Sequence, residues 1–168
     1  MNYLQSSRVD TAGPTLPMAW LPAFFGLAVI GVESTALMGG ANTGRWLLEL
    51  CHSLWGQTDG PAFEMAHVIL RKLGHFVGYG TLALFFRRGW YASVRRGWTG
   101  TWNGLRGTVA ALAVASTLVV ASLDEWHQSF LVGRGSSPHD VMLDTLGAIL
   151  FNAVLLVVVA RRRRALLG

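Results

Sequence analysis

Apolar residues gather in four long blocks separated by short polar connections. The blocks predict helices at about Pro17–Met38, Ala66–Phe86, Gly104–Leu123 and Pro138–Ala160. At 1.5 Å per residue, each block is long enough to cross the roughly 30 Å hydrocarbon core of a bilayer. The pattern therefore predicts an all-α polytopic membrane protein with four transmembrane helices, which form a single domain over residues 1–168.

A further helical pattern, at Gly44–Trp55, lies between the first two blocks. Arg45 and Glu49 fall on one face of this helix, and Leu47 and Leu50 fall on another. Amphipathic helices of this kind lie in the membrane interface, with their tryptophans at headgroup level. We therefore expect a short interfacial helix between spans one and two.

The composition is that of a chain solvated by lipid. Hydrophobic residues make up 52% of the chain and charged residues 14%, and mean hydropathy is +0.40. An ordinary soluble domain has about 25% charged residues. The composition is therefore not that of a cytosolic enzyme or of an intrinsically disordered chain. Cys51 is the only cysteine, which excludes an intrachain disulfide and a cysteine-based zinc site.

Basic residues predict the orientation. The net charge is +5, and most arginines fall between spans two and three or in the tail that follows Ala160. The positive-inside rule then places both segments, and with them both termini, in the cytoplasm. Anionic lipid is the expected partner of such arginines, and we do not expect the chain to bind nucleic acid. A signal peptide is the competing interpretation of span one, but Glu33 interrupts the expected cleavage region.

Ionisable side chains from all four predicted spans fall near the outer end of the bundle. The uncharged stretch Leu73–Phe86 covers only roughly 21 Å at 1.5 Å per residue, so flanking charges must enter the membrane. Such groups usually face the bundle interior or a wet cavity, and we expect a polar site here. The groups are Glu33, Arg71, Lys72, His75, Asp124, Glu125, His127, Asp140 and Asp144.

Helical spacing places these groups on one face of each helix, because residues three, four and seven apart lie on the same side. A structural network of ion pairs would explain the same charges, and Arg71 could extend to the outer headgroups. Ser137-Pro138 followed by Asp140 is also a good helix start without further function. The polar faces that this helical spacing predicts are Lys72, His75 and Tyr79 in the second span; Asp124, His127 and Gln128 at the end of the third; and Asp140, Asp144 and Gly147 in the fourth.

Four blocks in order over residues 71–147 resemble the signature of the VanZ-like family of bacterial integral membrane proteins. The family pattern is roughly R-K-x-x-H-F-x-x-Y, then D-E-x-H-Q-x-F-x-P-G-R, then D-V-x-x-D/N-T-x-G. The matching blocks are Arg71–Tyr79, Asp124–Phe130, Gly133-Arg134 and Asp140–Gly147.

Two positions depart from that pattern. Val132 stands where the family commonly has proline, which alters the turn that holds Arg134, and Gly78 stands where an acidic residue is frequent. The family is named for an accessory protein of teicoplanin resistance. The resemblance therefore implies the cell envelope and the bacterial inner membrane as the setting, and it implies neither a cofactor nor a defined reaction.

The first functional hypothesis is a site that binds or handles an anionic lipid-linked envelope component, with a link to glycopeptide resistance. Guanidinium and ammonium groups would engage a phosphate or carboxylate, and Gly74, Gly78 and Gly80 would let helices approach closely around an acyl chain. The residues assigned to this binding are Arg71, Lys72, Tyr79, Gln128, Arg134, Asp140 and Asp144.

The alternative is an intramembrane hydrolase or transferase. His75 or His127 would act as general base or nucleophile, and Asp124 or Glu125 would orient the histidine. A metal variant would use the same histidines with carboxylates, although no metal site is assigned and the cofactor stays open. A structural or transport-related helical bundle is the third alternative.

The orientation can be tested by thiol labelling. After Cys51→Ser, a cysteine introduced by Ser136→Cys should react with an impermeant reagent added to intact cells, because it follows span three on the outer side. A Ser93→Cys variant should react only after lysis. The reverse pattern would invert the topology.

Overall fold

The computed structural model describes residues 15–56, 60–132 and 134–167, and all the regular structure of these residues is helical. The predicted all-α class is confirmed. Residues 1–14, 57–59, 133 and 168 and the side chains of Arg163, Leu166 and Leu167 lie outside the described part. The elements are α1 (Leu16–Glu33), η1 (Ala36–Met38), α2 (Gly40–Trp55), α3 (Pro61–Val94), η2 (Arg95–Gly97), α4 (Trp102–Gln128) and α5 (Pro138–Leu167).

Each predicted block becomes a helix, but the bounds differ. α1 ends at Glu33, five residues before the predicted Met38, because the chain turns at Ser34 into a short 3-10 segment. α3 runs past the predicted Phe86 as far as Val94, and α4 runs to Gln128. The longer α4 places both of its carboxylates inside its last helical turns, where their direction is fixed.

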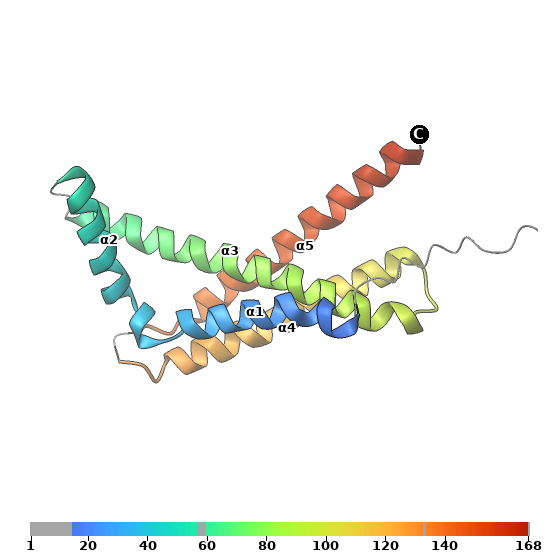
Figure 1. Cartoon of the computed structure of the whole chain (residues 1–168), viewed down its shortest axis with the longest axis horizontal. Coiled ribbons are helices and arrows are strands. Elements are labelled where there is room, and N and C mark those ends of the chain that lie inside the picture. The colour runs from blue at the N-terminus through green and yellow to red at the C-terminus, as the bar shows by residue number, and fades with distance from the viewer. Residues whose placement is uncertain (1–14, 57–59, 133, 168) are drawn as a thin grey trace, which may run out of the picture.

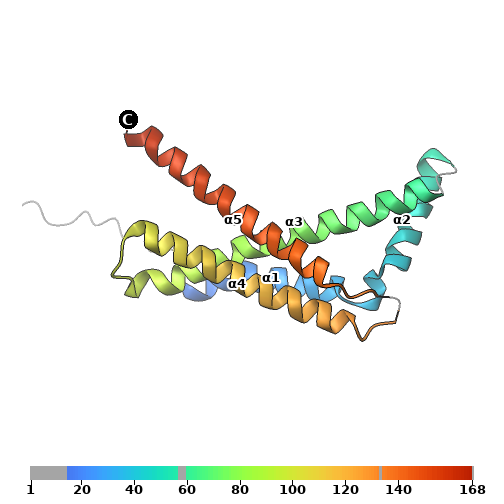
Figure 2. The same ribbon diagram turned by 180° about the vertical axis from the view of Figure 1, so that it is seen from behind.

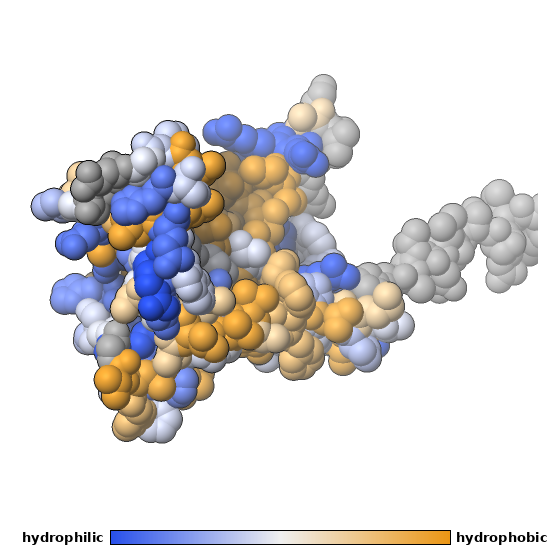
Figure 3. All heavy atoms as spheres, turned by 60° about the vertical axis from the view of Figure 1, so that its left-hand side comes forward, coloured by the Kyte–Doolittle hydropathy of each residue, from blue (hydrophilic) through white to orange (hydrophobic). Residues whose placement is uncertain are grey.

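Three of the described helices are long and apolar enough to cross a membrane, namely α1, α4 and α5 as far as Arg162. α3 is the longest helix, but basic residues limit its uncharged stretch to Leu73–Phe86. On the surface, apolar side chains cover much of the face in Figure 3, and hydrophilic side chains gather in separate groups.

α3 is the central helix and packs against α1, α4 and α5. The second half of α3 runs beside α1 and α4, whereas α5 crosses α3 and diverges toward its C-terminus (Figures 1 and 2). The end of α1, all of α2, the start of α3, the end of α4 and the start of α5 lie toward one end of the molecule. We call this the α2 end, and the end that carries η2 is the η2 end.

The buried core lies where α3 meets α1 and α4. Leu82 and Phe86 of α3 pack in one cluster with Ala113 and Ala121 of α4, whose small side chains allow close packing. At the α2 end, the Thr43 hydroxyl of α2 lies 3.1 Å from Nε2 of His67 in α3. The core cluster thus joins α1, α3 and α4, and the contact between Thr43 and His67 joins α2 to α3.

Glycine allows the close crossing of α3 and α5. A Cβ on Gly147 would overlap the carbonyl oxygen of Phe76, and a Cβ on Gly80 would lie 2.7 Å from the Phe151 ring. The expectation of close approach at Gly74 and Gly78 was wrong, since nothing described lies within 4 Å of a Cβ at either position. Spacing alone could not tell which glycines face a neighbouring helix.

Gly147→Ala should destabilise the protein, because the Cβ would force the two backbones apart. Overpacking of this kind reduces the unfolding free energy by about 1–3 kcal/mol. Gly78→Ala is the matched control, since an open helical position gains stability from alanine. Thermal unfolding in detergent, followed by circular dichroism, should show a lower midpoint only for Gly147→Ala. Equal midpoints would contradict the tight crossing.

Candidate functional site

A polar cavity opens between α3, α4 and α5 at the α2 end. It encloses ≈ 590 Å³, its open mouth included. Charged groups from three helices and from the connection after α4 therefore reach one space. Its lining residues are Val68, Arg71, Lys72, His75, Glu125, Gln128, Arg134, Gly135, Asp140 and Leu143.

An ion pair joins α3 and α5 at the wall of this cavity. Nζ of Lys72 lies 2.7 Å from Oδ1 of Asp140, and both side chains keep contact with solvent. Partly exposed pairs of this kind contribute little to stability, about 0–1 kcal/mol. The main effect of the pair is to hold the ammonium group at the cavity.

The start of α5 explains why Asp140 is available for this pair. Oγ of Ser137 accepts a hydrogen bond from the backbone N–H of His139 at 3.2 Å, so the predicted N-cap is confirmed. The backbone N–H of Ser137 donates to Oε2 of Glu125 at 2.8 Å. Glu125 thus occupies the place that a capping box would give to Asp140. Because Glu125 accepts the hydrogen bond from the backbone N–H of Ser137, the carboxylate of Asp140 is free to pair with Lys72.

A buried hydrogen-bond junction lies beneath the cavity. Oδ2 of Asp124 accepts from the Tyr79 hydroxyl at 2.9 Å and from Nε2 of Gln128 at 2.8 Å. All three side chains are buried, and two donors offset the loss of hydration of the carboxylate. Asp124 therefore fastens α4 to α3 and is committed to that role.

Asp144 is the carboxylate beside His75. Nδ1 of His75 lies 3.6 Å from Oδ2 of Asp144, whose side chain is 1% exposed. The sequence pattern left Asp124 or Glu125 as the acid that orients this histidine, but both have other partners. Nδ1 of His75 and Oδ1 of Asp144 are buried without a hydrogen-bond partner among the described residues. This pair is the least satisfied part of the site.

Arg134 ties the connection after α4 to the end of α1. Its guanidinium donates to the carbonyl oxygens of Thr35, at 2.8 Å, and of Glu33. Arg134 therefore contacts the backbone at the end of α1. Burial, and then the nearby charge of Arg71, lower the pKa of Arg134 below its usual value. A lowered arginine pKa means that these surroundings disfavour the positive charge.

Arg71 lies between two spaces, because it also lines an adjoining cavity of ≈ 510 Å³ with Glu33 and Arg134. Among residues 15–56, 60–132 and 134–167, no carboxylate oxygen lies within 4 Å of either arginine. Nε of Arg134 is also buried and without a described partner. The site therefore contains cationic donors that the described chain does not satisfy.

His127 is not brought to the cavity. Its side chain is exposed, and its Nδ1 lies 3.0 Å from Oγ of Ser34. Consecutive helical residues are turned by about 100°, so His127 points away when Gln128 faces inward. The predicted polar face of α4 therefore consists of Asp124, Glu125 and Gln128, and His127 belongs to the contact with the end of α1.

An apolar groove adjoins the cavity. It is lined by Ile69, Lys72, Leu73, Phe76 and Leu143, and it shares Lys72 and Leu143 with the polar space. The sequence carried no signal for Leu143 or Gly135 as lining residues, nor for the backbone partners of Arg134. Hydropathy marks a leucine as apolar without showing that a cavity lies beside it.

The described acidic and histidine side chains of the site do not form a metal-ligand set. No group of three or more His, Cys, Asp or Glu side chains among the described residues could hold a metal ion. His75 and His127, the two histidines of the metal variant, have different neighbours, Asp144 and Ser34. The geometry thus gives no ligand set for that variant within the described part of the chain.

Comparison with known protein families gives a match over most of the chain. A family model described as VanZ/LLP1 matches residues 17–160. This range contains every residue that lines the cavity and the groove. No curated protein and no solved structure matches the chain.

Tyr79→Phe should destabilise the protein, because it removes one of the two donors to the buried Asp124. A hydrogen bond to a charged group contributes about 1.5–3 kcal/mol. Tyr91→Phe is the control, since the Tyr91 ring packs edge-on against Trp102 at the η2 end. Chemical denaturation in detergent should show a loss of unfolding free energy only for Tyr79→Phe. A neutral Tyr79→Phe would contradict the structural role of Asp124.

Proposed function

The chain belongs to the VanZ/LLP1 family, in agreement with its sequence resemblance, and from this premise we propose that it binds the anionic headgroup of a lipid-linked cell-envelope component. The observation that carries the proposal is the charge of the cavity. Arg71, Lys72 and Arg134 face two carboxylates, those of Glu125 and Asp140. The space therefore has an excess of positive charge.

The cations differ in how firmly they are held. Lys72 is paired with Asp140, and Arg134 is fixed by backbone carbonyls. Arg71 has no carboxylate partner among the described residues, so it can turn toward a ligand. A phosphate matches the planar fork of a guanidinium, and it would offset the repulsion between Arg71 and Arg134, which adds to the effect of burial in lowering the pKa of Arg134.

The groove supports a lipid rather than a free anion. Phosphate bound near Lys72 would lie at the boundary where Leu143 borders both the polar cavity and the apolar groove. The hydrocarbon chain attached to this phosphate could then extend from the cavity into the groove, along Ile69, Leu73 and Phe76. Insertion of the chain in the bilayer, which contributes about 0.8 kcal/mol for each CH₂, would keep a lipid phosphate in the membrane beside the cavity, and a soluble phosphate has no such anchor.

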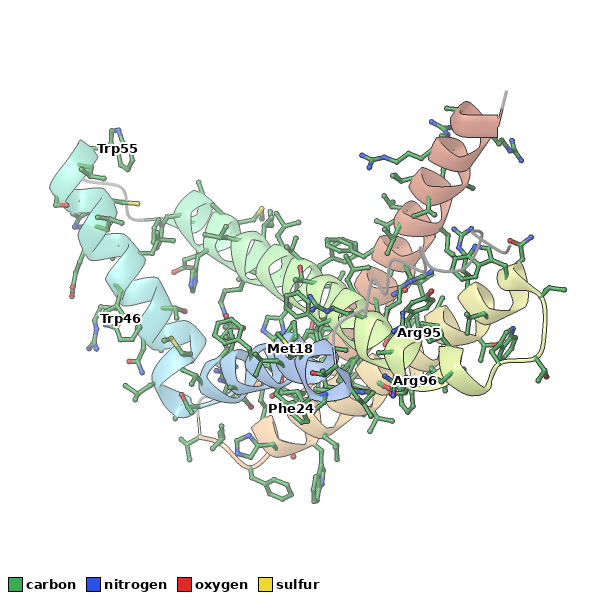
Figure 4. All side chains as sticks on the ribbon, turned by 45° about the vertical axis from the view of Figure 1, so that its right-hand side comes forward. Met18, Phe24, Trp46, Trp55, Arg95 and Arg96 are labelled. Carbon is green, nitrogen blue, oxygen red and sulfur yellow. The ribbon has the colours of Figure 1, made fainter. Side chains whose placement is uncertain are left out.

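The membrane arrangement belongs to the same proposal. α3 forms the fourth span, and α2 lies in the outer interface of the bacterial inner membrane. Trp46 and Trp55 project from α2 at one end, while Arg95 and Arg96 lie at the other (Figure 4). Tryptophan at an interface and arginine on the cytoplasmic side favour an outward cavity and cytoplasmic termini. A link to teicoplanin resistance would then act through the bound envelope component.

A hydrolase or transferase is the second candidate, and the His75–Asp144 pair is the observation that favours it. Asp144 lies 3.6 Å from Nδ1 of His75, and His75 lines the cavity. A histidine oriented by a buried carboxylate can serve as a general base. In this variant the lipid bound by Arg71 and Lys72 would also be the substrate.

Arg71→Gln should weaken the binding of a lipid phosphate at least tenfold, which corresponds to about 1.4 kcal/mol. The control is Arg45→Gln, because Arg45 is an exposed arginine of α2 outside the cavity. The measurement is native mass spectrometry of the detergent-purified chain, titrated with phosphatidic acid or with zwitterionic phosphatidylcholine. Equal weakening in both variants, or no preference for phosphatidic acid, would refute the binding site.

Release of phosphate from the same lipid separates binding from catalysis. Retention of phosphatidic acid without release favours the binding protein. Phosphate release that is lost in His75→Gln and in Asp144→Asn, while lipid is still retained, favours the enzyme. Phosphate release that persists in both variants would exclude the His75–Asp144 pair as its source.

A further inference from the structure

Two arginines at the opposite end of the bundle play no part in the cavity. Arg87 of α3 donates from Nη1 to Oδ1 of Asn152 at 3.1 Å. Arg106 of α4 donates from Nη2 to the carbonyl oxygen of Leu156 at 3.0 Å. Two cations from different helices therefore converge on one face of α5.

The two contacts are close together. Asn152 and Leu156 lie four residues apart in α5, which corresponds to a rise of about 6 Å. Asn152 is buried at 3% exposure, and its amide nitrogen donates to the carbonyl of Ala148 at 3.0 Å. The acceptor for Arg87 is thus fixed in place, and one phosphate group could reach both guanidinium groups.

Most of the N–H donors on these arginines have no partner among the described residues. Each guanidinium carries five N–H groups, but each makes one described hydrogen bond, and both acceptors are neutral. Among the described residues, no carboxylate oxygen lies within 4 Å of either arginine. Charged side chains at membrane depth normally meet an opposite charge, and the described chain supplies none.

The acidic residues lie elsewhere. Every acidic residue of the described segments belongs to the end of α1, to α2, to the first half of α3, to the last two turns of α4 or to the first two turns of α5. A counterion for Arg87 and Arg106 is therefore expected from outside the described chain. These acids are Glu33, Glu49, Glu64, Asp124, Glu125, Asp140 and Asp144.

The neighbouring surface favours a lipid as the source of that counterion. Beyond the crossing, α5 diverges from α3 and α4 (Figures 1 and 2). Val154, Val157 and Val158 of this part of α5 are 54%, 50% and 40% exposed. Acyl chains can cover these valines while the phosphate lies between the two arginines.

We propose that Arg87 and Arg106 together bind the phosphate of an anionic phospholipid in the membrane leaflet at the η2 end. The site shares no residue with the cavity at the α2 end and does not depend on the function proposed for it. The planar guanidinium groups would donate to the phosphate oxygens, and α5 would contact the acyl chains.

The test is native mass spectrometry of the full chain in detergent, titrated with phosphatidylglycerol or phosphatidylcholine. All variants carry Arg71→Gln, so that the opposite cavity contributes little. Arg87→Gln combined with Arg106→Gln should weaken phosphatidylglycerol binding at least tenfold and leave phosphatidylcholine binding unchanged. Arg95→Gln combined with Arg96→Gln removes the same charge from the same end and should change affinity by less than twofold.

Several results would overturn the site. Equal weakening in both double variants would indicate general attraction to the basic surface. Unchanged binding in the Arg87/Arg106 variant would exclude these residues. Displacement of the lipid by millimolar glycerol phosphate would identify a soluble phosphate as the ligand. Should the double variant fail to fold, Arg106→Gln alone is judged against Arg96→Gln, with a severalfold loss expected only for Arg106→Gln.

Discussion

The backbone contact between Gly147 and Phe76 is the constraint on which the polar site depends. Gly147 follows Asp144 by three residues, and Phe76 follows His75 directly. Because α5 can approach α3 this closely, Asp144 is buried beside His75. The same crossing brings Asp140, one turn earlier in α5, to Lys72. A wider separation of the helices would leave both acids without their partners, and for the buried Asp144 the loss is costly, because buried carboxylates without partners are strongly disfavoured.

The polar groups divide into a satisfied set and an unsatisfied set. Asp124 accepts from two buried donors, and Glu125 accepts from the start of α5, so these acids stabilise the junction of three helices. Arg71, His75 and part of Arg134 face the cavity with unused hydrogen-bonding capacity. Asp124 and Glu125 have their hydrogen-bond partners, whereas several donors that face the cavity have none among the described residues. Such a site is suited to bind a polar ligand.

The sequence predicted the helices and the gathering of charged groups toward one end of the bundle, because hydropathy and helical periodicity are local properties. It placed His75 and Tyr79 correctly on one face of α3. It could not predict that His127 turns away, or that Asp144 rather than Asp124 meets His75, because both depend on the rotation of one helix against another. The partners of Arg134 are backbone carbonyls, which every residue possesses and no sequence pattern marks.

The two ends of the bundle differ in how their charges are balanced, and this difference bears on what each end can do. Carboxylates near the cavity offset part of its positive charge, so a ligand bound there would be exchangeable. Arg87 and Arg106 have only neutral acceptors among the described residues. An uncompensated pair of this kind is costly in a membrane, so a lipid bound there would remain as a lasting part of the fold. If both proposals hold, the lipid at the η2 end stabilises the crossing of α3 and α5, and that crossing positions the groups that bind the exchangeable ligand.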